Sequence, residues 1–108
     1  MKRLSVGKNI TAGTSNLIYT VPAGYQVQWN LLYLHNGGGN TKSITVSWYD
    51  ASENTTINIF DAYSLASKDY FKFDGGAYVV LEAGDTISIT PEASSTFYAI
   101  CTFVLERV

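Results

Sequence analysis

The stretch YQVQWNLLYLHN, from Tyr25 to Asn36, is the longest strand-like run of the sequence and decides the fold class. Its odd positions are apolar or aromatic through Tyr33, while its even positions begin polar and become apolar at Leu32 and Leu34. Alternation with a period of two is typical of a β-strand with one buried face. We therefore predict a strand that has one solvated face at its start and is covered on both faces near Leu32 and Leu34.

The same alternation recurs along the rest of the chain, and no window has the apolar spacing of an amphipathic helix. Short β-branched and aromatic runs are separated by turn residues at intervals of about 8–12 residues. This spacing predicts an all-β fold, an antiparallel β-sandwich of about eight strands that is jelly-roll-like. We expect short strands at 70–73 and 78–81 with a turn at 74–76 between them, and a helical turn is an alternative for residues 61–67.

The size and composition predict one domain. A chain of 108 residues, of which 46% are hydrophobic and 15% charged, fits neither a disordered chain nor a coiled coil. Residues 1–14 form an N-terminal arm or a first edge strand, and residues 15–108 form the sandwich. The net charge of −2 argues against nucleic acid as a partner, because nucleic-acid binders usually carry a basic surplus.

The N-terminus and the cysteine content bear on the compartment. Met1-Lys2-Arg3 is followed by no apolar stretch of the kind that a signal peptide needs, and no segment approaches the ~20 apolar residues of a membrane span. The single cysteine, Cys101, has no internal partner and lies in an apolar run, so we interpret it as a buried hydrophobic residue. We expect a protein made in a cytoplasm, with no membrane partner.

Chemical motifs are scarce, and we expect neither an enzyme nor a cofactor. His35 is the only histidine, and its position at the end of a strand predicts a rim or core residue rather than a catalytic base. With one histidine and one cysteine, the chain lacks the ligands of an ordinary zinc site. The glycine-rich segment 37–43 lacks the glycine before Lys42 that a phosphate loop needs, and a strand rather than a helix follows it. Asp50 and Glu53 share one loop, which leaves a calcium ion as a hypothesis.

The last strand-like run, residues 97–105, has two apolar faces. Tyr98, Ile100 and Val104 alternate opposite a complete core set, and a sandwich strand normally has one wet face. The second face is covered by a loop, by the N-terminal arm or by another subunit; we predict a homo-oligomer, because closed symmetry hides such a patch. A trimer is favoured by analogy with jelly-roll assemblies. The predicted oligomer-interface residues are Leu32, Leu34, Tyr98, Ile100 and Val104.

Exposed aromatic residues suggest a second class of function. Tyr49, Tyr70 and Tyr98 lie out of phase with the predicted core positions of their strands. Aromatic rings at a surface can stack against sugars, as they stack against other flat apolar groups. A carbohydrate- or receptor-binding module that uses these three tyrosines is therefore the alternative to a structural protein.

Two segments carry a resemblance to a known group of proteins. Residues 18–24, IYTVPAG, with the strand ending in Leu34-His35-Asn36, and residues 81–89, LEAGDTISI, resemble small virion proteins of tailed bacteriophages. The resemblance implies a head-decoration, neck or tail protein that is oligomeric and binds other virion proteins, with no catalytic residues. It also implies that the chain is located in the virion after assembly in the host cytoplasm.

Overall fold

Residues 2–108 form eight strands, and none of these residues is helical. The structure is a computed structural model that describes residues 2–108, with the backbone alone for residues 74–78. The strands are β1 (Lys2–Ile10), β2 (Asn16–Thr20), β3 (Tyr25–Asn36), β4 (Lys42–Asp50), β5 (Thr55–Leu65), β6 (Tyr70–Leu81), β7 (Thr86–Pro91) and β8 (Phe97–Arg107). The described residues therefore include no helix that could cross a membrane.

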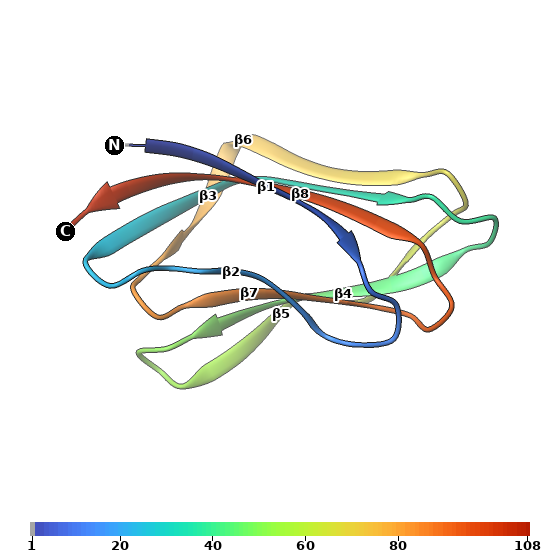
Figure 1. The fold of residues 1–108 in the computed structure, drawn as a ribbon, viewed down its shortest axis with the longest axis horizontal. Coiled ribbons are helices and arrows are strands. Elements are labelled where there is room, and N and C mark those ends of the chain that lie inside the picture. Colours follow the sequence, from blue (N-terminus) through green and yellow to red (C-terminus); the bar gives the residue numbers. More distant parts are fainter. Residues whose placement is uncertain (1) are drawn as a thin grey trace.

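The strands form two four-stranded antiparallel sheets with the orders β1-β8-β3-β6 and β2-β7-β4-β5. Strands pair as β1 with β8, β2 with β7, β3 with β6 and β4 with β5, as in a long hairpin rolled upon itself. The pairings of β3 with β8 and of β4 with β7 then complete the two sheets. The layers face each other as a sandwich (Figure 1), and the predicted jelly-roll-like architecture is confirmed.

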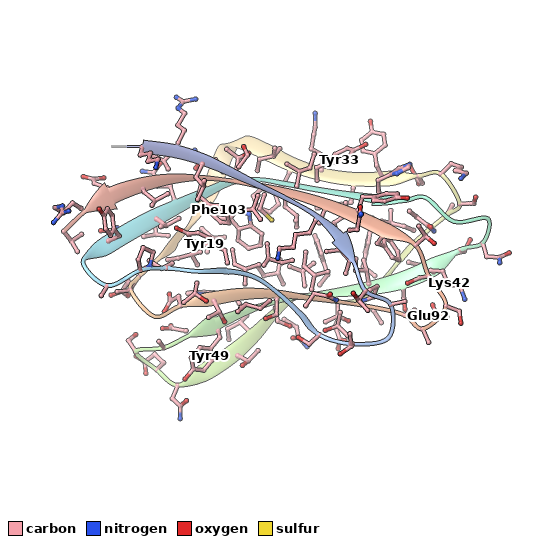
Figure 2. The ribbon with its side chains drawn as sticks, viewed as in Figure 1. Tyr19, Tyr33, Lys42, Tyr49, Glu92 and Phe103 are labelled. Atoms are coloured by element: carbon pink, nitrogen blue, oxygen red, sulfur yellow. The ribbon has the colours of Figure 1, made fainter. Side chains whose placement is uncertain are left out.

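The core lies between the two layers and is built from the inward-facing residues of both. Trp29, Phe97 and Phe103 are its largest fully buried side chains. Tyr19 of β2 stacks on Phe103 of β8 with ring centroids 4.5 Å apart, so aromatic contact joins the two sheets (Figure 2). Burying a side chain of this size contributes roughly 1.5–3 kcal/mol, which makes these contacts central to stability.

A β-bulge in the middle of β3 changes which residues face the core. The register with β8 and β6 shifts between Trp29 and Leu31, and the indole N–H of Trp29 donates to the Leu31 carbonyl at 3.0 Å. An extra residue at a bulge reverses the alternation beyond it. Leu32 and Leu34 are therefore 0% exposed core residues of the single chain, and the prediction that they form a second apolar face covered by another subunit is wrong.

Two further expectations about local structure are also wrong. Residues 61–67 form no helical turn, because β5 continues to Leu65, with Ala62 at a φ of 53° inside it. Residues 70–81 form one strand rather than two. The register of β6 jumps from Val79, opposite Trp29, to Asp74, opposite Leu31, so the segment predicted as a turn lies inside this irregularity.

Candidate functional site

The outer surface of the β1-β8-β3-β6 sheet is the part of the molecule most suited to binding a partner. Its central strands present Tyr98 and Ile100 from β8 and Tyr33 and His35 from β3, with Tyr70 beside them on β6. We call these five residues the aromatic face. Tyr98 and Ile100 are each 41% exposed and Tyr70 is 56% exposed, although all three side chains are large.

The register of the sheet aligns the aromatic face in rows. His35 lies between Tyr98 and Tyr70, its direct neighbours on β8 and β6. The His35 and Tyr98 rings are stacked with centroids 6.0 Å apart, and the Tyr33 and Tyr70 rings lie 5.7 Å apart. Because such ring pairs support one another, the four rings form a continuous surface rather than isolated exposed side chains.

Ile100 occupies an open position in the next row. Its neighbours are Gly7 on β1 and Tyr33 on β3. A Cβ placed on Gly7 would meet no atom within 4 Å, so the flank of Ile100 toward β1 is open. One row further, the hydroxyls of Ser5 and Thr102 lie 2.9 Å apart in a hydrogen bond. This hydroxyl pair therefore interrupts the apolar surface on the β1 and β8 side, whereas exposed Val80 lies further along on β6.

The loop after β3 supports the Tyr98 ring. A Cβ added to Gly37 would lie 2.6 Å from Cε2 of Tyr98, so only glycine allows the ring to rest on this backbone. Buried Asn36 holds the loop in place: its amide donates to the carbonyls of Leu65 and Asn40, and its Oδ1 accepts from the N–H of Gly38. The backbone of this loop therefore fixes the orientation of the Tyr98 ring.

The predicted interface residues divide into three groups. Tyr98 and Ile100 are exposed on the aromatic face, whereas Leu32 and Leu34 face the core. Val104 occupies an outward register position but is only 7% exposed. Sequence reasoning missed Tyr33 and His35 as surface residues because the bulge in β3 reverses the alternation that was used to place them. The sequence contains no direct signal for this bulge.

The three tyrosines of the predicted sugar-binding platform do not lie together. Tyr70 and Tyr98 flank His35 in one row of the aromatic face. Tyr49 lies on β4 of the opposite sheet, where its hydroxyl donates to Oδ1 of Asn54 at 2.6 Å (Figure 2). A platform of all three is therefore excluded, and the pair Tyr70 and Tyr98 remains.

The remaining candidates are Cys101, Asp50 and the glycine-rich segment 37–43, and their contacts account for them as parts of the fold. Cys101 is buried in the core, as predicted, and burial raises its thiol pKa to about 12. Asp50 accepts a hydrogen bond from the Ser52 hydroxyl, and the described residues contain no group of three His, Cys, Asp or Glu side chains that could hold a metal ion. The glycine-rich segment leads directly into β4, which begins at Lys42, so no helix N-terminus faces it.

No known family model matches the chain, and no curated protein matches it. Solved structures do match. A protein of Bacillus endospore appendages, described as disulfide-linked pili, gives a TM-score of 0.54 at 14% identity over 99% of this chain and 86% of its own. The globular domain of zebrafish complement 1qA gives a TM-score of 0.51 at 18% identity, with 98% of both chains covered.

Part of a viral protein has the same fold. A chain of infectious bursal disease virus, Gt strain, gives a TM-score of 0.56 at 5% identity over 96% of this chain. The match covers 31% of the viral chain, so the present chain corresponds to about a third of it. At these identities the similarity establishes the β-sandwich fold, which occurs in viral and other structural proteins, and function is argued from the surface.

Proposed function

We propose that the protein is a non-enzymatic structural component of a phage particle, in which its copies associate through the aromatic face and bind neighbouring capsid or tail proteins. The observation that carries the proposal is the exposure of Tyr98, Ile100 and Tyr70 on one sheet surface. Monomeric proteins rarely expose contiguous apolar patches of this kind, and tyrosine is enriched in protein interfaces.

Across the aromatic face, the two central strands of the sheet carry no charge on their outer side, and the cations Lys72 and Arg3 lie on the flanking strands β6 and β1. From Tyr98 to Val104 on β8, and from His35 back to Gln28 on β3, the outward positions hold no acidic residue, Lys or Arg. Interface centres are depleted of charge in the same way, because a charged group loses hydration when a partner covers it. Each large apolar side chain that becomes buried contributes roughly 1.5–3 kcal/mol to association.

The edges of the sheets are poorly suited to association. On β1, Lys8 pairs with the core residue Ala99 and so lies on the inner side of its strand, which opposes pairing with another strand. β2 has only five residues and a register shift, β5 has two register shifts, and the pairing of the fourth edge strand, β6, with β3 also shifts its register. Bulged, short or charged edges do not accept a further strand readily. The sheet face is therefore the better surface for association.

The assignment to a particle rests on the resemblance of residues 18–24 and 81–89 to tailed-phage virion proteins, together with a fold shared with a viral protein and a pilus protein. In this proposal the protein assembles in the host cytoplasm and resides in the virion. A trimer is the proposed assembly, by analogy with jelly-roll assemblies.

Two measurements test the proposal. Analytical ultracentrifugation at micromolar concentration is expected to give the mass of a trimer, and a monomer at that concentration would contradict association through the aromatic face. Mass spectrometry of purified heads and tails is expected to find the chain in one of them. Its absence from both would contradict a place in the particle.

Carbohydrate binding is the second candidate, and the adjacency of Tyr70 and Tyr98 around His35 favours it. Two exposed rings in one row provide a flat surface on which sugar rings can stack. A glycan array tests it with the variants Tyr70→Ala and Tyr98→Ala. Binding that both variants lose would support the candidate, and the absence of any bound glycan would reject it.

A further inference from the structure

A second surface feature lies at the opposite end of β3. A hollow of about 400 Å³ is lined by Lys2, Pro22, Tyr25, Leu105 and Arg107. Tyr25 is paired with Arg107, and Lys2 with Leu105, at the end of the sheet where both chain termini lie (Figure 1). Its volume is within the range of small-molecule sites, roughly 300–1,000 Å³.

The cations of this hollow are available to an anion. Among the residues whose side chains the structure describes, no carboxylate forms an ion pair with Lys2 or Arg107. Arg107 is nevertheless held in place, because its Nη2 donates to the Tyr25 hydroxyl at 3.2 Å and its guanidinium lies 5.3 Å from the centre of the Tyr25 ring. A guanidinium that is already oriented loses little conformational freedom when it binds a carboxylate.

A second hollow adjoins the first at Tyr25. It has a volume of about 490 Å³, and Gln26, Ser52 and Glu82 contribute its polar side chains. An amide, a hydroxyl and a carboxylate together donate and accept the hydrogen bonds that sugar hydroxyls make. The tyrosine between the hollows provides an aromatic surface next to a cationic hollow on one side and a hydroxyl-binding hollow on the other.

We infer that these joined hollows, which we call the Tyr25 site, bind a carboxylate-bearing saccharide. The carboxylate lies against Arg107 and Lys2, a sugar ring contacts Tyr25, and the hydroxyls of the next residue reach Gln26 and Ser52. This binding site is separate from the aromatic face: Tyr25 and His35 are at opposite ends of β3, about 30 Å apart in an extended strand. Its test therefore does not depend on whether the protein self-associates.

The test is an NMR titration of the full chain with trigalacturonate, with the neutral galactose trimer as the matched ligand. We expect saturable shifts of the Tyr25 and Arg107 signals with the acidic trimer alone. Arg107→Gln should weaken binding about tenfold or more, since hydrogen bonds to charged groups are the stronger kind. Lys2→Gln should weaken it less, because an ammonium binds without the paired geometry of a guanidinium.

The control variant is Lys8→Gln, which makes the same charge change on the same strand but outside both hollows. Binding to this variant should equal that of the native chain. Equal weakening by Lys8→Gln and Lys2→Gln would show attraction by net charge and overturn the inference. Equal binding of the neutral trimer, tighter binding of inorganic phosphate, or no shifts at Tyr25 and Arg107 would overturn it as well.

Discussion

The two sheets have the same architecture, but the residues on their outer surfaces differ in chemistry. Apart from Tyr49, whose hydroxyl is bonded to Asn54, the outward residues at the centre of β4 and β7 in the second sheet are small and hydroxylated: Thr45, Ser47, Thr86, Ser88 and Thr90. The corresponding central strands of the first sheet, β3 and β8, present Tyr33, His35, Tyr98 and Ile100. Threonine favours strands and remains hydrated, so the second surface is what a sandwich in water needs. The fold does not require the first surface, and this difference indicates where a partner binds.

Single exposed apolar residues do not weaken this contrast. Leu17, Ile57 and Tyr63 are exposed on the second sheet, but they lie on its two edge strands, β2 and β5, rather than on its central strands. Isolated exposed apolar side chains are common on soluble proteins. On the first sheet the exposed residues are contiguous across β8, β3 and β6, so partner binding is inferred from their grouping rather than from their number.

The largest effect is expected from two variants at neighbouring positions of β3, one on its core side and one on its outer side. Leu34→Ala removes a fully buried side chain and should lower the free energy of unfolding by about 2–5 kcal/mol, because it leaves a cavity. Tyr33→Ala, on the outer side, should cost the isolated subunit about 1 kcal/mol and weaken association. Urea denaturation of both variants, below the concentration of association, measures the difference.

This pair also tests the bulge. If β3 alternated without interruption through Asn30, Tyr33 would face the core and the order of the two effects would reverse. A larger loss of stability in Tyr33→Ala than in Leu34→Ala would therefore contradict both the register of β3 and the composition of the aromatic face.

A charge placed on each outer surface gives the next largest effect. Ile100→Asp puts a carboxylate into the aromatic face and should raise the dissociation constant of the oligomer about 30-fold, or about 2 kcal/mol. Ser47→Asp puts the same charge on the second sheet and should leave association unchanged. Sedimentation across a dilution series compares them. Equal weakening by the two variants would show that the contrast between the surfaces has no bearing on assembly.

Sequence reasoning predicted the class of fold because local signals determine it. Turn residues such as Pro22 and Gly84 separate alternating runs, and both features survive in the structure. The aromatic face could be predicted only in part. Tyr98 and Ile100 were predicted because they lie on β8, where the alternation is uninterrupted through Phe103. His35 and Tyr33 lie beyond the bulge, whose position depends on how β3 pairs with two other strands.

The support beneath Tyr98 illustrates a second limit. In the sequence, Gly37 is one of three consecutive loop glycines, and no feature of the sequence distinguishes it from Gly39. In the structure the two differ, because a Cβ on Gly37 would meet the Tyr98 ring and a Cβ on Gly39 would meet no atom within 4 Å. Contacts between residues 61 positions apart depend on the register of β3 with β8, which local patterns do not encode.

A smaller effect is therefore expected from Gly37→Ala, with Gly39→Ala as its control. The added methyl should displace the Tyr98 ring from its stack on His35, at a cost of about 1 kcal/mol or less because the ring can rotate away. The measurement is the ring-current shift of the His35 proton signals by NMR. Unchanged His35 signals in Gly37→Ala would contradict the described support, as would equal changes in Gly39→Ala.

The smallest effect is expected at the end of the second sheet, where Glu92 braces the start of β4. Its Oε1 accepts a hydrogen bond from the Ser43 N–H at 2.9 Å, and its Oε2 lies 3.7 Å from Nζ of Lys42 (Figure 2). The Ser43 hydrogen bond, with help from Lys42, lowers the pKa of Glu92 below its ordinary value of 4.5.

A lowered pKa of Glu92 in the folded state means that its carboxylate stabilises the fold at pH values above the ordinary pKa. That stabilisation is lost as the pH falls through the folded value. The free energy of unfolding of the native chain should therefore exceed that of Glu92→Gln slightly at neutral pH, and the two should converge as the pH falls through the lowered pKa of Glu92. Glu53→Gln, which removes an exposed carboxylate on the loop between β4 and β5, is the matched control for the loss of one negative charge. Because Glu92 lies outside the aromatic face, Glu92→Gln should leave the dissociation constant unchanged at neutral pH. A change in association with this variant would mean that the second sheet also contributes to assembly.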